Sequence, residues 1–159
     1  MKKLISIAAF ILLAFSAFAQ DGRSLYNKFS EAQGVSAVYI SPAMFRLVGK
    51  IPSLEIGEGD VDISPVIRSL DGLYVIDSEN PSINGEIRND AERFIKSGKY
   101  ELLMEVKEEG DLCHIYTVRK GNTITSLVLL SYEPDECTFI CLDGQIPMDQ
   151  FEKVISSVR

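Results

Sequence analysis

The chain has 159 residues, of which 46% are hydrophobic, and it carries 23 acidic against 16 basic side chains, so its net charge at pH 7 is −7. This apolar content is sufficient for the core of one ordinary domain. An acidic surface repels nucleic acid phosphates and anionic lipid headgroups. We therefore expect no nucleic acid partner and no attachment to an anionic membrane surface.

Residues 1–19 have the features of a secretory signal peptide. Lys2 and Lys3 form a positively charged start, residues 4–15 are apolar, and Ala17-Phe18-Ala19 fits the small-x-small cleavage pattern. The apolar stretch is shorter than the about 20 residues that a membrane span needs. An apolar N-terminal helix packed in the core is the alternative interpretation.

Cleavage after Ala19 would leave residues 20–159 as a single domain with 14 basic and 23 acidic side chains, a net charge of −9. No cysteine lies near the cleavage site, so we do not expect a lipoprotein. The mature domain is expected to be periplasmic or extracellular, without a stable membrane anchor.

The first half of this domain is expected to alternate between helices and two strands. The elements in chain order are a helix over 23–33, a strand over Val35–Ile40, a helix from Ser41-Pro42 to Gly49, a loop with a possible short edge strand over 50–63, a short helix from Ser64-Pro65 to Leu70, a turn at Asp71-Gly72 and a strand over Leu73–Asp77. Serine before proline favours a helix start, because the hydroxyl can cap the helix and proline suits its first turn.

The second half begins with the clearest helical pattern, an amphipathic stripe over 83–98. The period then changes to alternation, which predicts four antiparallel strands joined by tight turns. These strands are expected over 102–107, 112–119, 124–132 and 137–142, and a final helix is expected from Pro147 with the stripe Met148, Phe151, Val154, Ile155 and Val158. Residues 100–107 are also good helix formers, so their strand assignment competes with a helix.

Together these elements predict an α+β fold: a single mixed, mostly antiparallel sheet of about six strands, with helices packed mainly on one face. The residues expected to be largely buried are Phe29, Val38, Ile40, Ile76, Ile87, Phe94, Met104, Ile115, Val128, Phe139, Phe151 and Ile155.

Two stretches resemble a known family. The first has Lys28-Phe29-Ser30 followed by Val38-Tyr39-Ile40-Ser41, and the second begins at Ser97-Gly98-Lys99-Tyr100-Glu101. In this order they resemble the family named domain of unknown function 4252, small exported proteins of Gram-negative bacteria. The resemblance covers residues 25–155 and fits least well over Glu55–Asp62. It implies export and a compact α+β domain, with an association to envelope signalling, and it carries over no catalytic residue.

His114 is the single histidine, so a general-base or triad mechanism would have to use it. Its neighbour Cys113 points to the opposite face of a regular strand and cannot be its partner. Cys137 or Cys141 could approach from elsewhere in the sheet, but nothing in the sequence requires this. We expect a structural histidine.

The three cysteines fit neither zinc nor a disulfide. Cys137 and Cys141 lie four strand residues apart, about 13 Å, which is too far for one tetrahedral centre or for a bridge. The strand from Ile124 should also separate Cys113 from Cys137. We expect three free thiols that act mainly as small buried hydrophobic groups, with a Cys113–Cys141 bridge as the alternative if the strand order differs.

Glu58, Asp60, Asp62 and Ser64 alternate as calcium ligands do, but the glycine and the distal glutamate of an EF-hand are missing. A solvated acidic loop is the better interpretation. Ser41 and Ser64 precede prolines at helix starts, so capping rather than nucleophilic chemistry explains them. We recognise no glycine-rich phosphate loop and no nucleotide motif, although carboxylates distant in sequence could still converge.

The sequence therefore predicts no catalytic, cofactor-binding or metal-binding residues and no cofactor. The favoured function is that of a non-enzymatic envelope protein that binds a protein or a small ligand through a sheet face or a helix groove. The alternatives are a hydrolase or other enzyme with dispersed acidic residues, and a regulator in envelope-stress signalling. Converging acids in a deep pocket, or His114 beside a carboxylate, would favour the enzyme; an exposed apolar patch would favour the binding protein.

Export makes a direct prediction about the mature N-terminus. Mass spectrometry of protein from the periplasm or medium should give Gln20 as the first residue, in open or cyclised form. Intact protein beginning at Met1 in the cytosol would contradict the signal peptide and the compartment inferred from it.

Overall fold

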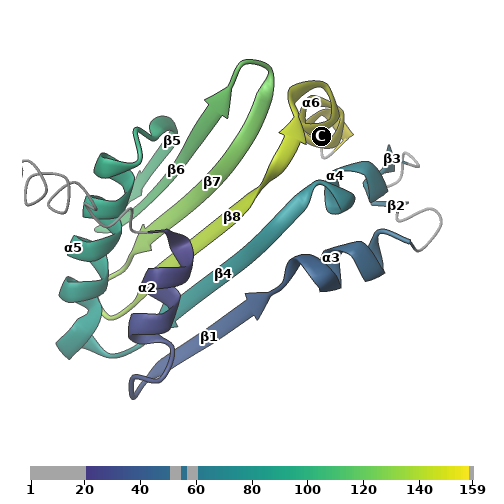
Figure 1. The fold of residues 1–159 in the computed structure, drawn as a ribbon. Helices are drawn as coiled ribbons and strands as arrows, with labels where there is room; N and C mark the ends of the chain where they lie inside the picture. The colour runs from purple at the N-terminus through teal and green to yellow at the C-terminus, as the bar shows by residue number, and fades with distance from the viewer. Residues whose placement is uncertain (1–20, 51–54, 57–60, 158–159) are drawn as a thin grey trace, which may run out of the picture.

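The computed structural model describes residues 21–50, 55–56 and 61–157, without the side chains of 55–56, 61 and 154–157. The expected signal peptide over residues 1–19 lies outside this part. The described chain forms a six-stranded sheet in the order β1-β4-β8-β7-β6-β5 (Figure 1). Its strands are β1 Val35–Ile40, β4 Leu70–Ser78, β5 Glu101–Glu108, β6 Asp111–Lys120, β7 Thr123–Tyr132 and β8 Cys137–Pro147; the helices are α2 Gly22–Phe29, α3 Pro42–Val48, α4 Ser64–Arg68, α5 Pro81–Ser97 and α6 Met148–Ser157.

The α+β class and the six strands are confirmed, but every neighbouring pair in the sheet is antiparallel, so the sheet is not mixed. The chain leaves β1, passes through α3 and α4 at one end of the sheet, and returns antiparallel along β4 (Figure 1). An antiparallel return needs no crossover along the sheet face. Helix α5 then carries the chain from β4 to β5 at the far edge.

Several boundaries differ from the sequence expectation. Asp71 belongs to β4, at a register shift between Leu70 and Gly72, rather than to a turn before the strand. A bulge accommodates the extra residue while pairing continues on both sides. Strand β8 continues to Pro147, five residues beyond its expected end. Within the expected loop over 50–63, the two-residue strands β2 Glu55–Ile56 and β3 Val61–Asp62 pair as a small hairpin.

Helices α2 and α5 cover one face of the sheet (Figure 1). Asn80 caps α5 by accepting a hydrogen bond from the Ser82 backbone N–H at 3.0 Å, and Pro81 occupies its first turn. The main core lies beneath these helices and contains Leu25, Phe29, Tyr74, Ile76, Ile87, Ala91, Phe94, Ile95, Val128, Leu130, Tyr132, Cys137, Phe139 and Cys141. Gly22 lets α2 approach β8 closely, since a Cβ there would lie 2.7 Å from Sγ of Cys141.

An ionic cluster joins the two covering helices. Lys28 Nζ on α2 lies 2.6 Å from Oδ2 of Asp90 and 2.6 Å from Oε1 of Glu86, both on α5. Arg93 also pairs with Asp90, whose side chain is only 3% exposed. A carboxylate this deeply buried needs such partners, because an unpaired buried charge is costly. The contacts with Asp90 and Glu86 also raise the pKa of Lys28.

A second, smaller cluster lies at the end of the sheet where α3, α4 and α6 gather (Figure 1). Its buried members are Phe45, Leu70, Ile124 and Ile146. Met148 and Phe151 of α6 pack against it and are half-buried. These helices therefore close one end of the sheet rather than its second face. Among the described residues, no helix has the length and apolar character to cross a membrane.

The expected core is confirmed on the helix side, where Phe29, Ile76, Ile87, Phe94, Val128 and Phe139 are buried. It is wrong on the other side. Val38 is 48% and Met104 47% exposed, and Ile40, Ile115 and Phe151 are half-buried. The side chain of Ile155 lies outside the described part. Hydrophobicity alone marked these residues as buried, although the described helices leave much of the second sheet face uncovered.

The packing of α5 predicts a large cost for truncating Phe94. This ring is 4% exposed and meets Phe139 edge-on, with 5.9 Å between ring centroids. Phe94→Ala should lower the free energy of unfolding by about 3–5 kcal/mol, because a cavity adds to the lost transfer energy. Leu47→Ala, at a side chain 63% exposed, is the control and should change it by less than about 1 kcal/mol. Urea unfolding measures both, and similar small costs would show that α5 does not form the core.

Candidate functional site

On the face of the sheet opposite α2 and α5, one row of apolar residues crosses all six strands. Register pairing connects one residue of each strand into a row; the row contains Val38, Val75, Ile140, Leu129, Ile115 and Met104. A second row, one strand repeat away, contains Ile40, Leu73, Leu142, Leu127 and Thr117. We call these two rows the open face.

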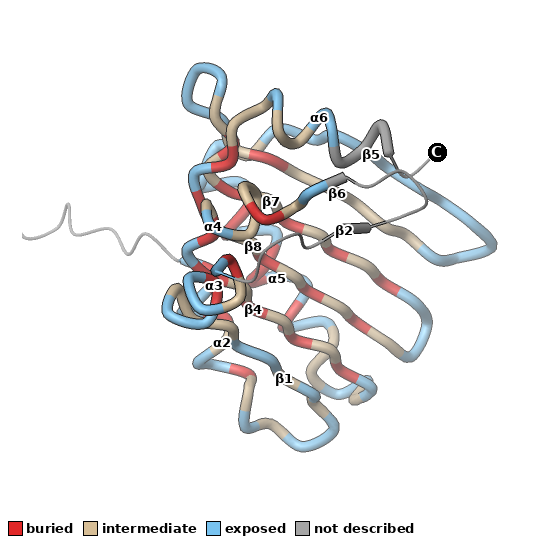
Figure 2. The backbone as a smooth tube through the Cα atoms, turned by 90° about the vertical axis from the view of Figure 1, so that its right-hand side faces the viewer, coloured by how far each residue is buried: buried red, intermediate tan, exposed pale blue. Residues whose placement is uncertain are grey.

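Alternation along the strands explains how this face arises. Successive side chains point to opposite sides, so the residues between the buried ones of β4, β7 and β8 face away from α5. Figure 2 shows this alternation of buried and intermediate positions along the central strands. An antiparallel sheet with one covered face usually places polar residues on the other. Here leucine, isoleucine and valine take those positions.

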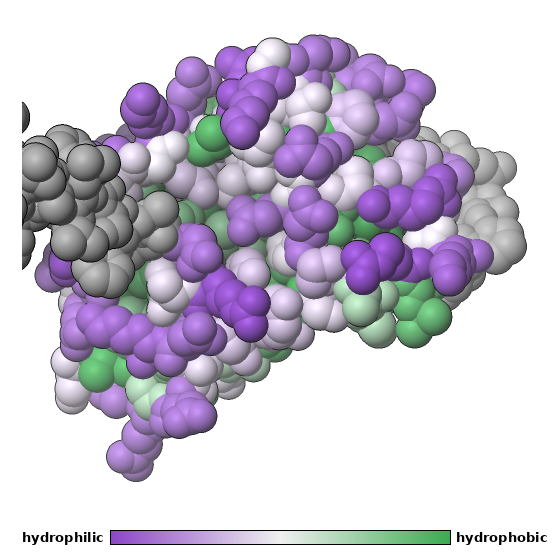
Figure 3. Space-filling model, in the orientation of Figure 1, coloured by the Kyte–Doolittle hydropathy of each residue, from purple (hydrophilic) through white to green (hydrophobic). Residues whose placement is uncertain are grey.

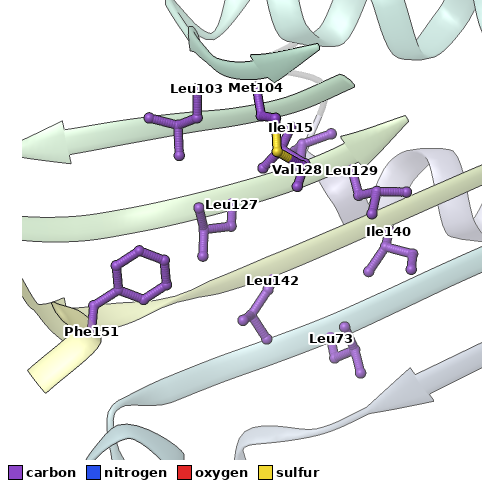
Figure 4. Close-up of a pocket in the computed structure, with 10 residues that line it drawn as sticks. All are labelled: Leu73, Leu103, Met104, Ile115, Leu127, Val128, Leu129, Ile140, Leu142 and Phe151. Carbon is purple, nitrogen blue, oxygen red and sulfur yellow. The ribbon is translucent and has the colours of Figure 1, made fainter. Parts of the chain in front are cut away.

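The open face is hollowed into a cavity of about 480 Å³ (Figure 4). Its lining contains Leu73, Leu103, Met104, Ile115, Leu127, Val128, Leu129, Ile140, Leu142 and Phe151, and none of these side chains is polar. Phe151 reaches it from α6, and Leu103 and Met104 come from the edge strand β5. By contrast, the surface on the side of α2 and α5 is largely hydrophilic (Figure 3).

Polar groups lie at the margins of the open face. At one margin Thr138 Oγ1 donates a hydrogen bond to Oδ1 of Asp77 at 2.8 Å. At the other, Nη2 of Arg119 lies 3.2 Å from Oε2 of Glu101. These four side chains therefore have partners within the protein, and no lining residue of the cavity has a side chain that forms hydrogen bonds. Such a cavity favours binding through apolar contact.

His114 lies beside a carboxylate, which raises the question of catalysis. Its Nε2 is 2.7 Å from Oε2 of Glu105 on the neighbouring strand, and its ring meets Tyr116 edge-on. Glu105 also pairs with Lys107 at 2.8 Å, and these contacts, Lys107 first, lower the pKa of its carboxyl group. Among the described residues, Glu105 is the one side chain recorded as hydrogen-bonded to His114.

A cysteine–histidine pair is absent at this position. Cys113 pairs in register with Ser131 and Val106 on the open side, whereas His114 pairs with Leu130 on the helix side. The two side chains therefore point away from each other, as the alternation predicted. With no nucleophile bonded to the imidazole, the His114–Glu105 contact acts as a cross-strand pair.

The polar residues that do converge lie on the helix side, and sequence reasoning missed them. Tyr100 donates to Ser126 Oγ at 2.8 Å, and Ser126 donates to Oδ1 of Asp143 at 2.8 Å, beside a cavity of about 260 Å³. Burial raises the pKa of Asp143. Asp21 also lines the cavity, but its Oδ1 accepts from the Ser24 backbone N–H at 2.8 Å. These groups come from separate elements, so no local motif could reveal them.

The lining of this second cavity contains the two acids Asp21 and Asp143 and no histidine. Asp143 accepts from Ser126 and carries no histidine between the hydroxyl and the carboxyl group, so it forms no relay that would activate the serine. Burial also raises the pKa of Tyr100, which keeps this hydroxyl protonated. We interpret the chain of hydroxyls as a means of satisfying buried polar groups.

The remaining candidates have structural roles. The Oγ of Ser41 accepts from the Met44 backbone N–H at 3.3 Å, which confirms the cap. Ser64 does not cap α4; instead its own backbone N–H donates to Oδ1 of Asp62 at 2.9 Å, and the contact with Ser64 lowers the pKa of Asp62. Glu58 and Asp60 lie outside the described residues. Within the described part, no three metal-ligating side chains form a group.

The three cysteines are free, as expected. Strand β7 does separate the strands that carry Cys113 and Cys137. Cys137 and Cys141 are buried on the helix side, and burial raises both of their pKa values, to about 11 for Cys137. Cys113 is half-buried on the open side, so it is not the buried hydrophobic group that the sequence suggested.

Comparison with known proteins supplies a family and no activity. The model of the family described as Domain of unknown function (DUF4252) matches residues 26–154. No curated protein and no solved structure matches the chain.

The placement of the thiols predicts their reactivity. In native protein at pH 8, a thiol reagent such as Ellman's reagent should modify Cys113 rapidly, because Cys137 and Cys141 are buried and protonated. Denaturation without reductant should expose all three thiols. Cys113→Ser should abolish the rapid phase and leave two thiols after denaturation, whereas Cys137→Ser should retain it. Rapid labelling in the Cys113→Ser variant would contradict the assignment.

Proposed function

Because the chain belongs to the family Domain of unknown function (DUF4252), whose description names no activity, we propose its function from its own geometry. We propose that it is an exported, non-enzymatic binding protein whose ligand contacts the open face of the sheet. The observation that carries this proposal is the cavity of about 480 Å³ whose lining has no polar side chain.

The energetics support a binding role. Leaving apolar surface in water costs about 25 cal/mol per Å². The strands keep Val38 and Met104 exposed at the two edges of the sheet, and the other eight apolar residues of the open face are only half-buried. An uncovered apolar surface of this extent is typical of a binding site. A ligand that removed it from water would gain free energy without any rearrangement of the core.

The His114–Glu105 contact is the arrangement named above as favouring an enzyme, but among the described residues the other groups that catalysis needs are not found beside it. His114 has a carboxylate partner and no nucleophile, and Asp143 has a serine partner and no histidine. The two groups lie on different strands, β6 and β8, with β7 between them. The ten residues that line the cavity have no side chain that could transfer a proton. We therefore assign the ligand contact to binding alone.

The binding site can be tested with N-phenyl-1-naphthylamine, an uncharged dye that fluoresces in apolar surroundings. The wild-type protein should bind it, and Leu129→Gln should weaken binding by at least about fivefold, because the amide must lose hydration in a site without partners. Met104→Gln, at a side chain 47% exposed on β5, should also weaken dye binding and should have little effect on folding.

Leu47→Gln is the matched control. It makes the same chemical change at a side chain 63% exposed on α3, away from the cavity lining, and should leave dye affinity unchanged. Circular dichroism of each variant checks that the fold is intact. Equal dye binding by wild type and the two open-face variants would contradict the proposed site.

A further inference from the structure

The size of the open face indicates what kind of ligand covers it, an inference that rests on the function proposed above. Six strands spaced about 4.8 Å apart and two rows of side chains about 7 Å apart give an apolar zone of about 24 Å by 14 Å, or roughly 340 Å². A stable protein interface buries about 800 Å² on each partner. The apolar zone alone is less than half of that area, so a protein partner would also have to bury polar surface around it. The cavity of about 480 Å³ lies within the range of small-molecule sites.

The lining determines the chemistry of the bound portion. All ten lining residues present carbon or sulfur (Figure 4). Any hydroxyl, amide or charge placed inside would lose its hydration without gaining a side-chain partner. The bound portion is therefore a hydrocarbon, and it extends across the strands from Leu73 on β4 to Leu103 on β5, with Phe151 at one end.

The charges around the zone determine the headgroup. Four acidic side chains lie on the same side of the sheet as the open face, as the register of the strands shows. They are Asp77, Glu101, Glu108 and Asp111. The same strands contribute one cation, Arg119, which is already paired with Glu101. The chain as a whole has a net charge of −7. This field repels an anionic headgroup.

We propose that the ligand is a single-chain lipid with an uncharged or zwitterionic headgroup. Its acyl chain occupies the cavity, and its headgroup stays in solvent at the margin of the open face. Half-buried leucine and isoleucine side chains of β6, β7 and β8 form the floor of the site, and Met104 and Phe151 form two of its walls.

The test uses displacement of N-phenyl-1-naphthylamine from the full mature chain by monoacylglycerols of increasing chain length, below their micelle concentrations. Each buried methylene adds favourable transfer energy, so affinity should rise roughly tenfold for every two carbons until the cavity is full. Lysophosphatidylcholine should bind like the monoacylglycerol of equal chain length. The fatty acid of that length should bind several-fold more weakly at pH 8, and this difference should shrink at high salt.

The outcomes separate this inference from the proposed function. If the dye binds to wild type and is lost in Leu129→Gln, but no lipid displaces it, the open face is a binding site and the lipid assignment is wrong. Displacement without dependence on chain length, or tightest binding by the fatty acid, would also overturn the assignment. If the dye does not bind to wild type at all, both proposals fail. Leu47→Gln should repeat every wild-type result.

Discussion

Helix α5 packs Ile87, Ala91 and Phe94 against the central strands, and this contact determines which side of β4, β7 and β8 is buried. The helix is long enough, at 17 residues, to carry the chain from β4 to the far edge strand β5 and to cover the strands that lie between them. Helix α2 completes this layer through Leu25 and Phe29. The Lys28–Asp90 contact fixes the two helices relative to each other while its buried charge stays paired.

Among the described residues, the helices α2 and α5 cover one side of the sheet and leave much of the opposite side uncovered. Most antiparallel sheets resolve this by alternating apolar and polar residues. In this chain Leu129, Ile140 and Leu142 stand where polar residues would serve folding better. The fold therefore retains an exposed surface that costs stability, and residues of this kind at a concave surface are best explained by a ligand.

Several ionisable groups of the described residues connect elements of the fold. Asp90 joins two helices, Asp143 ends a chain of buried hydroxyls, and Glu105 connects two strands through His114. Each of these carboxyl groups has hydrogen-bond or ionic partners within the protein, as buried polar groups require. A site of chemistry would need a nucleophile, a base and a third group in contact. These groups are instead distributed over separate strands, whereas the apolar residues gather on one surface.

The sequence by itself determined the elements of this protein. The stripe over 83–98 and the alternation after residue 100 depend on local periodicity, so helix α5 and the strand meander could be predicted, and with them the separation of Cys113 from Cys137. The opposed directions of Cys113 and His114 followed from the same alternation. These features depend only on residues close together in the chain.

The tertiary structure alone decided which apolar residues are buried. Met104 and Phe94 are both hydrophobic residues in periodic segments, yet one is 47% exposed and the other 4%. The difference arises because α5 crosses one face and the end helices stop at the margin of the other, which no local pattern encodes. The contact between Ser126 and Asp143 likewise depends on the register of two strands. The sequence could suggest a sheet face as a binding surface but not which residues form it, because that depends on where the helices pack.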